Sequence, residues 1–268
     1  MRIDLNSDVG ESFGPWQMGA DREVMRSITS ANVACGYHAG DPGVMRATVQ
    51  LARAHGVSVG AHPGFPDLAG FGRRELKMSA KDVEDMVVYQ IGALAAVAAA
   101  EGVELAHVKA HGALYSMAAR DRGLADAIAR AVRSVDRSLI LFGLPGSDLL
   151  EAGEAEGLQV ASEGFADRAY DRDGSLASRR EPGSVIDDPA EVVRRSVMMV
   201  REGRVVARDG SGLTFHVDTL CTHGDTPGAG ELTRLLRDGL ARAGVSVEPL
   251  AALRRPPSDV RRPTSEIQ

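Results

Sequence analysis

The sequence predicts an α/β protein folded as a distorted TIM-like barrel, with about seven parallel strands. Short runs of β-forming residues alternate with longer helical patterns along the chain. The chain has 268 residues, close to the ~250 that are typical of such barrels. Polar and ionisable residues recur where the apolar runs end. An open doubly wound sheet also fits the alternation, and we favour the barrel, with seven clear strands instead of eight.

Seven segments have the composition of strands in a parallel sheet covered on both sides. They are 2–9, 28–35, 57–62, 105–111, 138–144, 158–163 and 213–220. Long irregular segments, 63–78 and 165–187, follow the third and sixth of these strands. Loops of that length in a compact domain are usually lids or binding loops, so we expect both to lie over the barrel mouth.

Helical patterns fill the segments between the strands, and two of them carry capping signals. Asp41 precedes Pro42 at a first helical position, and Gly56 ends that helix. Ser79 followed by Asp82 resembles a capping box. Further helices are expected around 118–134, 147–156, 189–202 and 229–243.

Residues 1–250 are expected to form a single barrel domain, followed by a flexible tail, 251–268, that is rich in proline and charge. The net charge of −6 and the lack of a basic run interleaved with aromatics argue against a nucleic-acid partner. The first residues do not resemble a signal peptide, and no apolar run approaches the ~20 residues of a membrane span. The two cysteines are too few for a disulfide scaffold. We therefore expect a soluble, cytoplasmic protein.

Ionisable residues occur at the carboxyl ends of six of the seven predicted strands. In a parallel barrel these ends share one face, and that face carries the active site. The ordinary alternative is that loop residues are polar in any case. Several of these side chains lie within apolar runs, where solvation is difficult, and this favours a shared pocket.

Period-two spacing directs several polar side chains to the inside of the barrel. Asn6 and Asp8 alternate on the first strand, and Lys109 and His111 alternate on the fourth. A buried lysine requires a partner charge, for which Asp8 or Asp218 is suitable. Lys109 and His111 either stabilise an oxyanion or belong to a structural ion pair. The candidate catalytic residues are Asp8, Lys109, His111 and Asp218.

The other candidates share polar side chains near strand ends and are expected to bind the substrate. They are Asn6, Glu11, Asn32, His38, His62, Tyr115, Glu163, Arg168, His223 and Asp225. His107 lies deeper in its strand and is expected to be a core residue.

The histidines and cysteines leave other chemistries open. His38, His62, His111 and His223 come from different strand ends, which is compatible with a zinc or manganese site. No HxH or HExxH spacing occurs, so no residue is assigned to a metal. Cys35 near a histidine also fits a thiol nucleophile, but a lone cysteine beside apolar residues is more often a packing residue. Neither a P-loop nor a dinucleotide fingerprint is present.

Six longer motifs together resemble the lactam-utilisation (LamB/YcsF) family. They are DLNSDVGESFG, ITSANVACGYHAGDP, VGAHPGFPDLAGFGRR, HVKAHGALY, EGFADRAYDRDGSLASR and DTLCTHGDTPGA. The match runs in order from about Arg2 to Gly244 and covers almost the entire chain.

The resemblance implies a barrel of the glycoside hydrolase/deacetylase type. It also implies the 5-oxoprolinase reaction, in which 5-oxo-L-proline (pyroglutamate) is hydrolysed to L-glutamate with hydrolysis of ATP. The family works in a complex with two partner subunits, B and C. Because the sequence has no P-loop, ATP, with a divalent cation, would bind in an unusual site or with the partners.

Within that resemblance, several strand-end residues take expected roles. Asp8 or Asp218 would be the general base, and Lys109 and His111 would stabilise the oxyanion or phosphate. His38 and His62 would position water or substrate, and Arg168 would bind the substrate carboxylate. Two alternatives stay open: a metal-dependent amidase or deacetylase that acts alone, and a non-catalytic subunit that binds the substrate for a partner.

Overall fold

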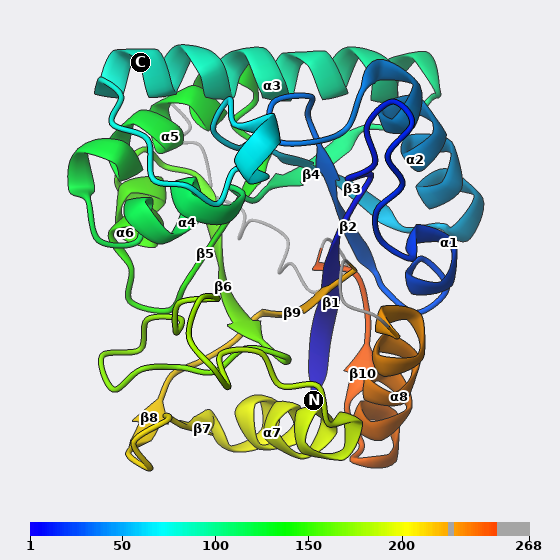
Figure 1. Ribbon diagram of the computed structural model, residues 1–268, viewed down its shortest axis with the longest axis vertical. Coiled ribbons are helices and arrows are strands. Elements are labelled where there is room, and N and C mark those ends of the chain that lie inside the picture. The colour runs from blue at the N-terminus through cyan, green and yellow to red at the C-terminus, as the bar shows by residue number, and fades with distance from the viewer. Residues whose placement is uncertain (225–227, 251–268) are drawn as a thin grey trace, which may run out of the picture.

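The computed structural model describes residues 1–224 and 228–250. Within them, seven parallel strands close into a barrel surrounded by helices (Figure 1). The strands are β1 (Arg2–Val9), β2 (Ser30–Ala34), β3 (Ser58–His62), β4 (Leu105–Val108), β5 (Ile140–Gly143), β6 (Gln159–Phe165) and β9 (Thr219–His223). The ring closes because β9 pairs with both β1 and β6. The predicted distorted barrel is therefore confirmed.

The first strand shows how the barrel is built. On β1, the apolar Ile3, Leu5 and Val9 are fully buried in the hydrophobic core. Asp4, Asn6 and Asp8, which alternate with them, point to the inside of the barrel, where Asp4 accepts hydrogen bonds from side chains on β2 and β9. Alternation along a strand sends successive side chains to opposite faces. The interior of this barrel is therefore polar along β1, unlike the branched apolar layers common in TIM barrels.

Eight helices in the described residues lie around the strands. They are α1 (Asp21–Val24), α2 (Pro42–His55), α3 (Ala80–Ala100), α4 (Gly112–Ala118), α5 (Arg122–Val135), α6 (Asp148–Ala155), α7 (Pro189–Glu202) and α8 (Ala229–Arg242). Both predicted caps are confirmed. Asp41 accepts hydrogen bonds from the backbone N–H groups of Gly43 and Val44, and Ser79 accepts one from Asp82.

The seventh predicted strand, 213–220, is wrong in its position. Its first residues belong to β8 (Gly212–Thr214), which forms an antiparallel hairpin with β7 (Arg204–Val206), and the barrel strand β9 begins only at Thr219. The chain leaves the hairpin before it enters the barrel, and an apolar run across both segments does not reveal that break. The short β10 (Ser246–Val247) pairs with β1 and was also not predicted.

The fourth predicted strand is too long, because β4 ends at Val108 and His111 already occupies the N-cap position of α4, without a side-chain capping hydrogen bond. The helix expected around 118–134 is α5, which begins only at Arg122, and the short α4, which ends at Ala118, was not predicted. In both cases a tight turn interrupts a pattern that looks continuous in the sequence. The predicted tail, 251–268, lies outside the described residues.

The helix α3 is the one helix in the described range that is long and apolar enough to cross a membrane. No apolar run near the length of a membrane span was expected from the sequence, whereas this helix of 21 residues passes the test of length and composition. In the structure α3 packs against α5, α2 and the strands β3 and β4 (Figure 1). Core helices of globular proteins pass the same test, so one such helix is weak evidence for a membrane span.

Candidate active site

The barrel mouth opens into a cavity of about 530 Å³. Its floor carries ionisable side chains from several strand ends: Asp8, His62, Lys109, His111 and His223. Its walls come largely from the two long loops that were expected there, 63–78 and 165–187. The cavity therefore combines side chains held by the rigid barrel with side chains carried on loops.

Lys109 is the centre of the floor. Its Nζ donates to Oδ1 of Asp8 at 2.9 Å and lies 2.9 Å from Oε1 of Glu163 and 3.0 Å from Sγ of Cys221. Burial opposes its positive charge, but Asp8, Cys221 and Glu163 outweigh burial and hold the pKa of Lys109 well above its ordinary value. Lys109 is therefore a fixed cation at neutral pH.

Asp8 is held from two sides. Its Oδ1 accepts hydrogen bonds from Lys109 and, at 2.8 Å, from Nδ2 of Asn32, and its Oδ2 lies 3.3 Å from Nε2 of His62. Asn32 in turn donates to Asn6 at 2.8 Å. Burial raises the pKa of Asp8, but His62 and Lys109 outweigh it and hold that pKa well below the ordinary value. Asp8 is thus an oriented carboxylate at the cavity floor.

Glu163 and Tyr115 lie together beside Lys109. Glu163 is fully buried on β6, and Tyr115 comes from α4 and lines the cavity. Burial and the charge of Glu163 raise the pKa of Tyr115 well above its ordinary value. The tyrosine is therefore a neutral hydroxyl in the pocket and is unsuited to act as a base.

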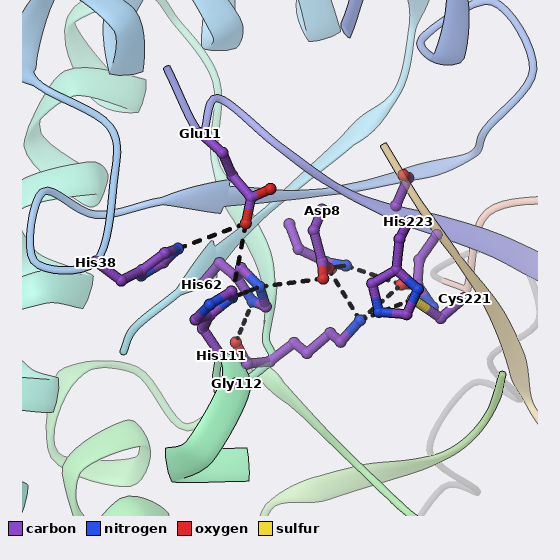
Figure 2. A network of polar contacts seen from close by, with 12 residues as sticks. Asp8, Glu11, His38, His62, His111, Gly112, Cys221 and His223 are labelled. Atoms are coloured by element: carbon purple, nitrogen blue, oxygen red, sulfur yellow. Dashed lines mark hydrogen bonds and ion pairs between the residues drawn. The ribbon is translucent and has the colours of Figure 1, made fainter. Parts of the chain in front are cut away.

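Three imidazoles gather next to Asp8 (Figure 2). Nδ1 of His62 lies 2.7 Å from the carbonyl oxygen of Lys109, and Nε2 of His111 lies 2.8 Å from that of Phe71. The His38 ring stacks on the His111 ring with 3.7 Å between centroids. Burial, with nearby histidines, holds the pKa values of His38 and His111 well below their ordinary value.

Glu11 faces this histidine group, and Figure 2 shows its carboxylate between His38 and His111. Its Oε1 lies 3.6 Å from Nε2 of His38 and 3.6 Å from Nδ1 of His111. Glu11 and His38 are buried and do not line the cavity itself. They lie behind His62 and His111, which face the cavity.

His223 is positioned by Asp167, a residue that was not among the predicted site residues. Asp167 accepts from the backbone N–H of His223 at 3.0 Å and lies 2.9 Å from its Nδ1. Burial raises the pKa of Asp167, but His223 outweighs it and lowers that pKa to about 2. The signal for Asp167 is its place two residues after the end of β6, in a loop that was predicted to lie over the barrel mouth.

Asp218 does not belong to this site. It precedes β9, its Oδ2 accepts from the backbone N–H of Ser162 at 2.9 Å, and its Oδ1 lies 3.0 Å from Nε2 of His216. The expectation that it reaches Lys109 is wrong, because the barrel strand begins at Thr219 and Asp218 lies at the opposite end from the cavity. Glu163 on β6, and not Asp218, is the second carboxylate beside Lys109.

Other predicted residues lie beneath the floor, in the wall or outside the described range. Asn6 and Asn32 are fully buried beneath the floor and do not line the cavity. Arg168 lines it, but its Nε donates to the carbonyl oxygen of Ser184 and its Nη2 to that of Ala177, so it also holds the loop in shape. Asp225 lies outside the described residues.

Arginines around the cavity were largely missed. The site prediction named only Arg168, whereas Arg73, Arg74, Arg120, Arg179 and Arg180 also line the cavity. The available signal was the pair of adjacent arginines in each long loop. The rim is accordingly suited to anionic groups.

Cys35 and His107 have packing roles. Burial raises the pKa of Cys35 to about 12, which leaves the thiol protonated and poorly nucleophilic. Nε2 of His107 lies 2.7 Å from Oδ1 of Asn32, and its ring stacks on Phe142 with 4.4 Å between centroids. The core role expected for His107 is confirmed.

The chain is similar to known proteins over nearly its whole length. The sequence model described as the LamB/YcsF family matches residues 3–255. The A subunit of 5-oxoprolinase from Tolumonas auensis is 55% identical over 247 residues, which are 92% of this chain and 98% of that protein. The protein of the same name from Methylococcus capsulatus is 54% identical, covering 94% of this chain and 95% of the relative.

Solved structures agree with the barrel. The lactam utilization protein from Thermus thermophilus superposes with a TM-score of 0.87 at 52% identity, covering 92% of this chain and 99% of that chain. A putative cellobiose-phosphate cleavage protein from Enterococcus faecalis has a TM-score of 0.56 at 12% identity, covering 95% and 99%. The second similarity shows a shared fold alone.

Proposed function

The chain belongs to the LamB/YcsF family, and from this premise we propose that it is the A subunit of a 5-oxoprolinase. The reaction is hydrolysis of the lactam amide of 5-oxo-L-proline (pyroglutamate) to give L-glutamate. The proposal is supported by relatives of that name that are 54–55% identical over more than nine-tenths of the chain. The observation that carries it is the Lys109 ammonium between Asp8 and Glu163 at the floor of an arginine-lined cavity.

The cavity suits a small, anionic amide. A volume of about 530 Å³ has room for 5-oxoproline and for a phosphate group beside it. The rim arginines offer planar donors for the carboxylate of the substrate, and the floor offers a cation and a carboxylate for its amide. We therefore place the lactam ring with its carbonyl oxygen toward Lys109 and its carboxylate toward the rim.

The floor residues divide the chemistry between them. Lys109 remains protonated and would stabilise the negative charge that develops on the carbonyl oxygen as water adds. Asp8 is ionised and oriented, and would accept a proton from that water. His62 and His111 would position the water, and Tyr115 would donate a hydrogen bond as a neutral hydroxyl.

We further propose that the reaction in this protein is coupled to ATP hydrolysis and requires partner subunits B and C, in the cytoplasm. A lactam amide is a poor electrophile, and ATP supplies the activation that hydrolysis needs. The arginine rim supports a phosphate group at the cavity entrance. A divalent cation would accompany the nucleotide, whose binding surface can include the partners.

The test is reconstitution with each of the three polypeptides omitted in turn, measuring glutamate release and ADP formation. We expect both products only with all three polypeptides and ATP present. Glutamate release by this chain alone without ATP would instead identify a stand-alone amidase. Binding of 5-oxoproline by this chain, with full turnover by B and C in its absence, would contradict a catalytic role.

A further inference from the structure

We propose that Glu11, His38, His62 and His111 form a binding site for one divalent transition-metal ion, with zinc as the reference ion. The four side chains offer ligand atoms that all lie within 4.8 Å of one another, and all four are buried. Three imidazoles and one carboxylate are donors that zinc and its first-row neighbours accept. The site lies beside Asp8 at the cavity floor (Figure 2).

The protonation of two rings follows from their backbone contacts. A carbonyl oxygen only accepts, so Nδ1 of His62 must carry a hydrogen toward Lys109, and Nε2 of His111 must carry one toward Phe71. In neutral rings this leaves Nε2 of His62 and Nδ1 of His111 as lone pairs. These two atoms face each other at 2.9 Å. Two facing lone pairs repel, and either a proton shared by the two nitrogens or a metal ion between them removes the repulsion.

His38 supplies an independent observation. It is fully buried, yet neither of its ring nitrogens has a hydrogen-bond partner among the described residues. A buried polar group without a partner is costly, and such groups often mark an ion or a functional role. The carboxylate of Glu11 approaches Nε2 of His38 and Nδ1 of His111 equally, at 3.6 Å. The buried His38 ring without a hydrogen-bond partner therefore marks this group of side chains as a candidate ion site.

The donor separations fit a coordination sphere. Ligands at about 2.1 Å in a tetrahedron lie about 3.4 Å apart, and the measured separations of 2.9 and 3.6 Å lie on either side of that value. Histidine ligands usually donate their second N–H to a backbone carbonyl, as His62 and His111 do. His38 and His111 are parallel, so one ion cannot lie in the plane of both rings as they stand. We therefore expect His38 to contribute least.

A second group, Asp8 with Cys221 and His223, also has convergent donors. Lys109 already places its ammonium 3.0 Å from Sγ of Cys221 and 2.9 Å from Asp8, and it would repel a metal ion there. The histidine group instead faces two carboxylates, those of Glu11 and Asp8. The ion is therefore assigned to the histidine group, where it would polarise a carbonyl or a bound water. The proposed metal binding does not depend on which reaction the pocket catalyses.

The experiment uses untagged, full-length protein freed of metal with a chelator. Zn²⁺ is titrated by calorimetry, bound metal is measured by elemental analysis, and Co²⁺ absorption reports the coordination. We expect one equivalent of Zn²⁺, a rise in Tm on binding, and a visible Co²⁺ band. Glu11→Gln and His62→Gln should each weaken binding at least tenfold, and His38→Gln should weaken it less.

His107→Gln is the matched control, because His107 is a buried histidine of the same barrel with no place in the site. It should bind Zn²⁺ as the wild type does. Binding of less than a tenth of an equivalent of Zn²⁺ by the wild-type protein would overturn the proposal. A proton shared between His62 and His111 would then explain their close contact. Undiminished binding by Glu11→Gln and His62→Gln also overturns it. If those variants fail to fold, the wild-type titration and Co²⁺ spectrum decide the question.

Discussion

Nζ of Lys109 donates to Oδ1 of Asp8 at 2.9 Å across the inside of the barrel, although the two residues are 101 positions apart. Closure of the parallel sheet brings the two strand ends together, and Glu163 adds a second carboxylate to the same ammonium. One cation between two buried carboxylates has a strong electrostatic preference for remaining charged. The ion pair is therefore available to stabilise charge that develops on a substrate.

Replacement of Asp8 by Asn should reduce kcat of the three-subunit enzyme by about 10²–10⁴, since a proton acceptor and the partner of Lys109 are both lost. Asp218→Asn is the matched control and should leave kcat within about twofold, because Asp218 contacts Ser162 and His216 outside the cavity. Steady-state glutamate release measures both variants. Equal losses in the two would refute this assignment of the base.

That contrast shows what the sequence can and cannot predict. Alternation on a strand correctly placed Asp8 and Lys109 on inward faces, because the period of two is a local property. It could not place Asp218, since an apolar run does not show where a hairpin ends and a barrel strand begins. The Lys109–Glu163 pairing depends on closure of the whole barrel and has no local signal.

The arginine rim was missed for a related reason. Its members are carried on irregular loops, whose path depends on contacts such as Arg168 with the carbonyl oxygen of Ser184. No periodicity constrains such side chains, so composition could identify the long loops as a wall of the pocket but could not indicate which arginines face it.

His107 should make the protein less stable in acid. Burial lowers its pKa to about 3, whereas an unfolded histidine titrates near 6.5. Between these values only the unfolded state takes up the proton, so the free energy of unfolding falls as pH decreases, by about 1.4 kcal/mol per pH unit. The stability that depends on a neutral His107 is fully present above about pH 6.5, and about 2 kcal/mol of it is lost by pH 5.

Urea unfolding of wild type and His107→Gln at pH 7.5 and pH 5 measures this effect. Glutamine keeps a donor for Oδ1 of Asn32 and does not titrate. The pH-dependent loss should be about 2 kcal/mol smaller in the variant. An identical loss in both proteins would show that His107 does not titrate as the structure indicates.

Asp167 should stabilise the fold through His223. Its pKa of about 2 in the folded state lies below the unfolded value of about 3.9. The contribution is present above the unfolded pKa and is lost as pH falls through about 2. Asp167→Asn should therefore lower the free energy of unfolding at pH 7 by about 2 kcal/mol. Urea denaturation provides the measurement, and a change below about 0.5 kcal/mol would contradict the expected ion pair.

The rim arginines should act on binding more than on chemistry. Arg180→Ala should raise KM for 5-oxoproline or ATP about tenfold and leave kcat within about threefold, because a lost rim contact weakens ground and transition states alike. Arg234→Ala is the control, since Arg234 lies on α8 and pairs with Glu231 and Asp238 away from the cavity. A fall in kcat without a change in either KM would argue against a binding role.

The most direct test of the proposed function is turnover of 5-oxoproline by the Lys109→Met variant, measured as glutamate release with partner subunits and ATP. Lys81→Met, which replaces an exposed lysine on α3, serves as the control. With complex assembly verified by size-exclusion chromatography, we predict that Lys109→Met loses at least about a hundredfold in kcat, while Lys81→Met retains wild-type activity. Unchanged turnover by an assembled Lys109→Met complex would contradict the catalytic role of this pocket.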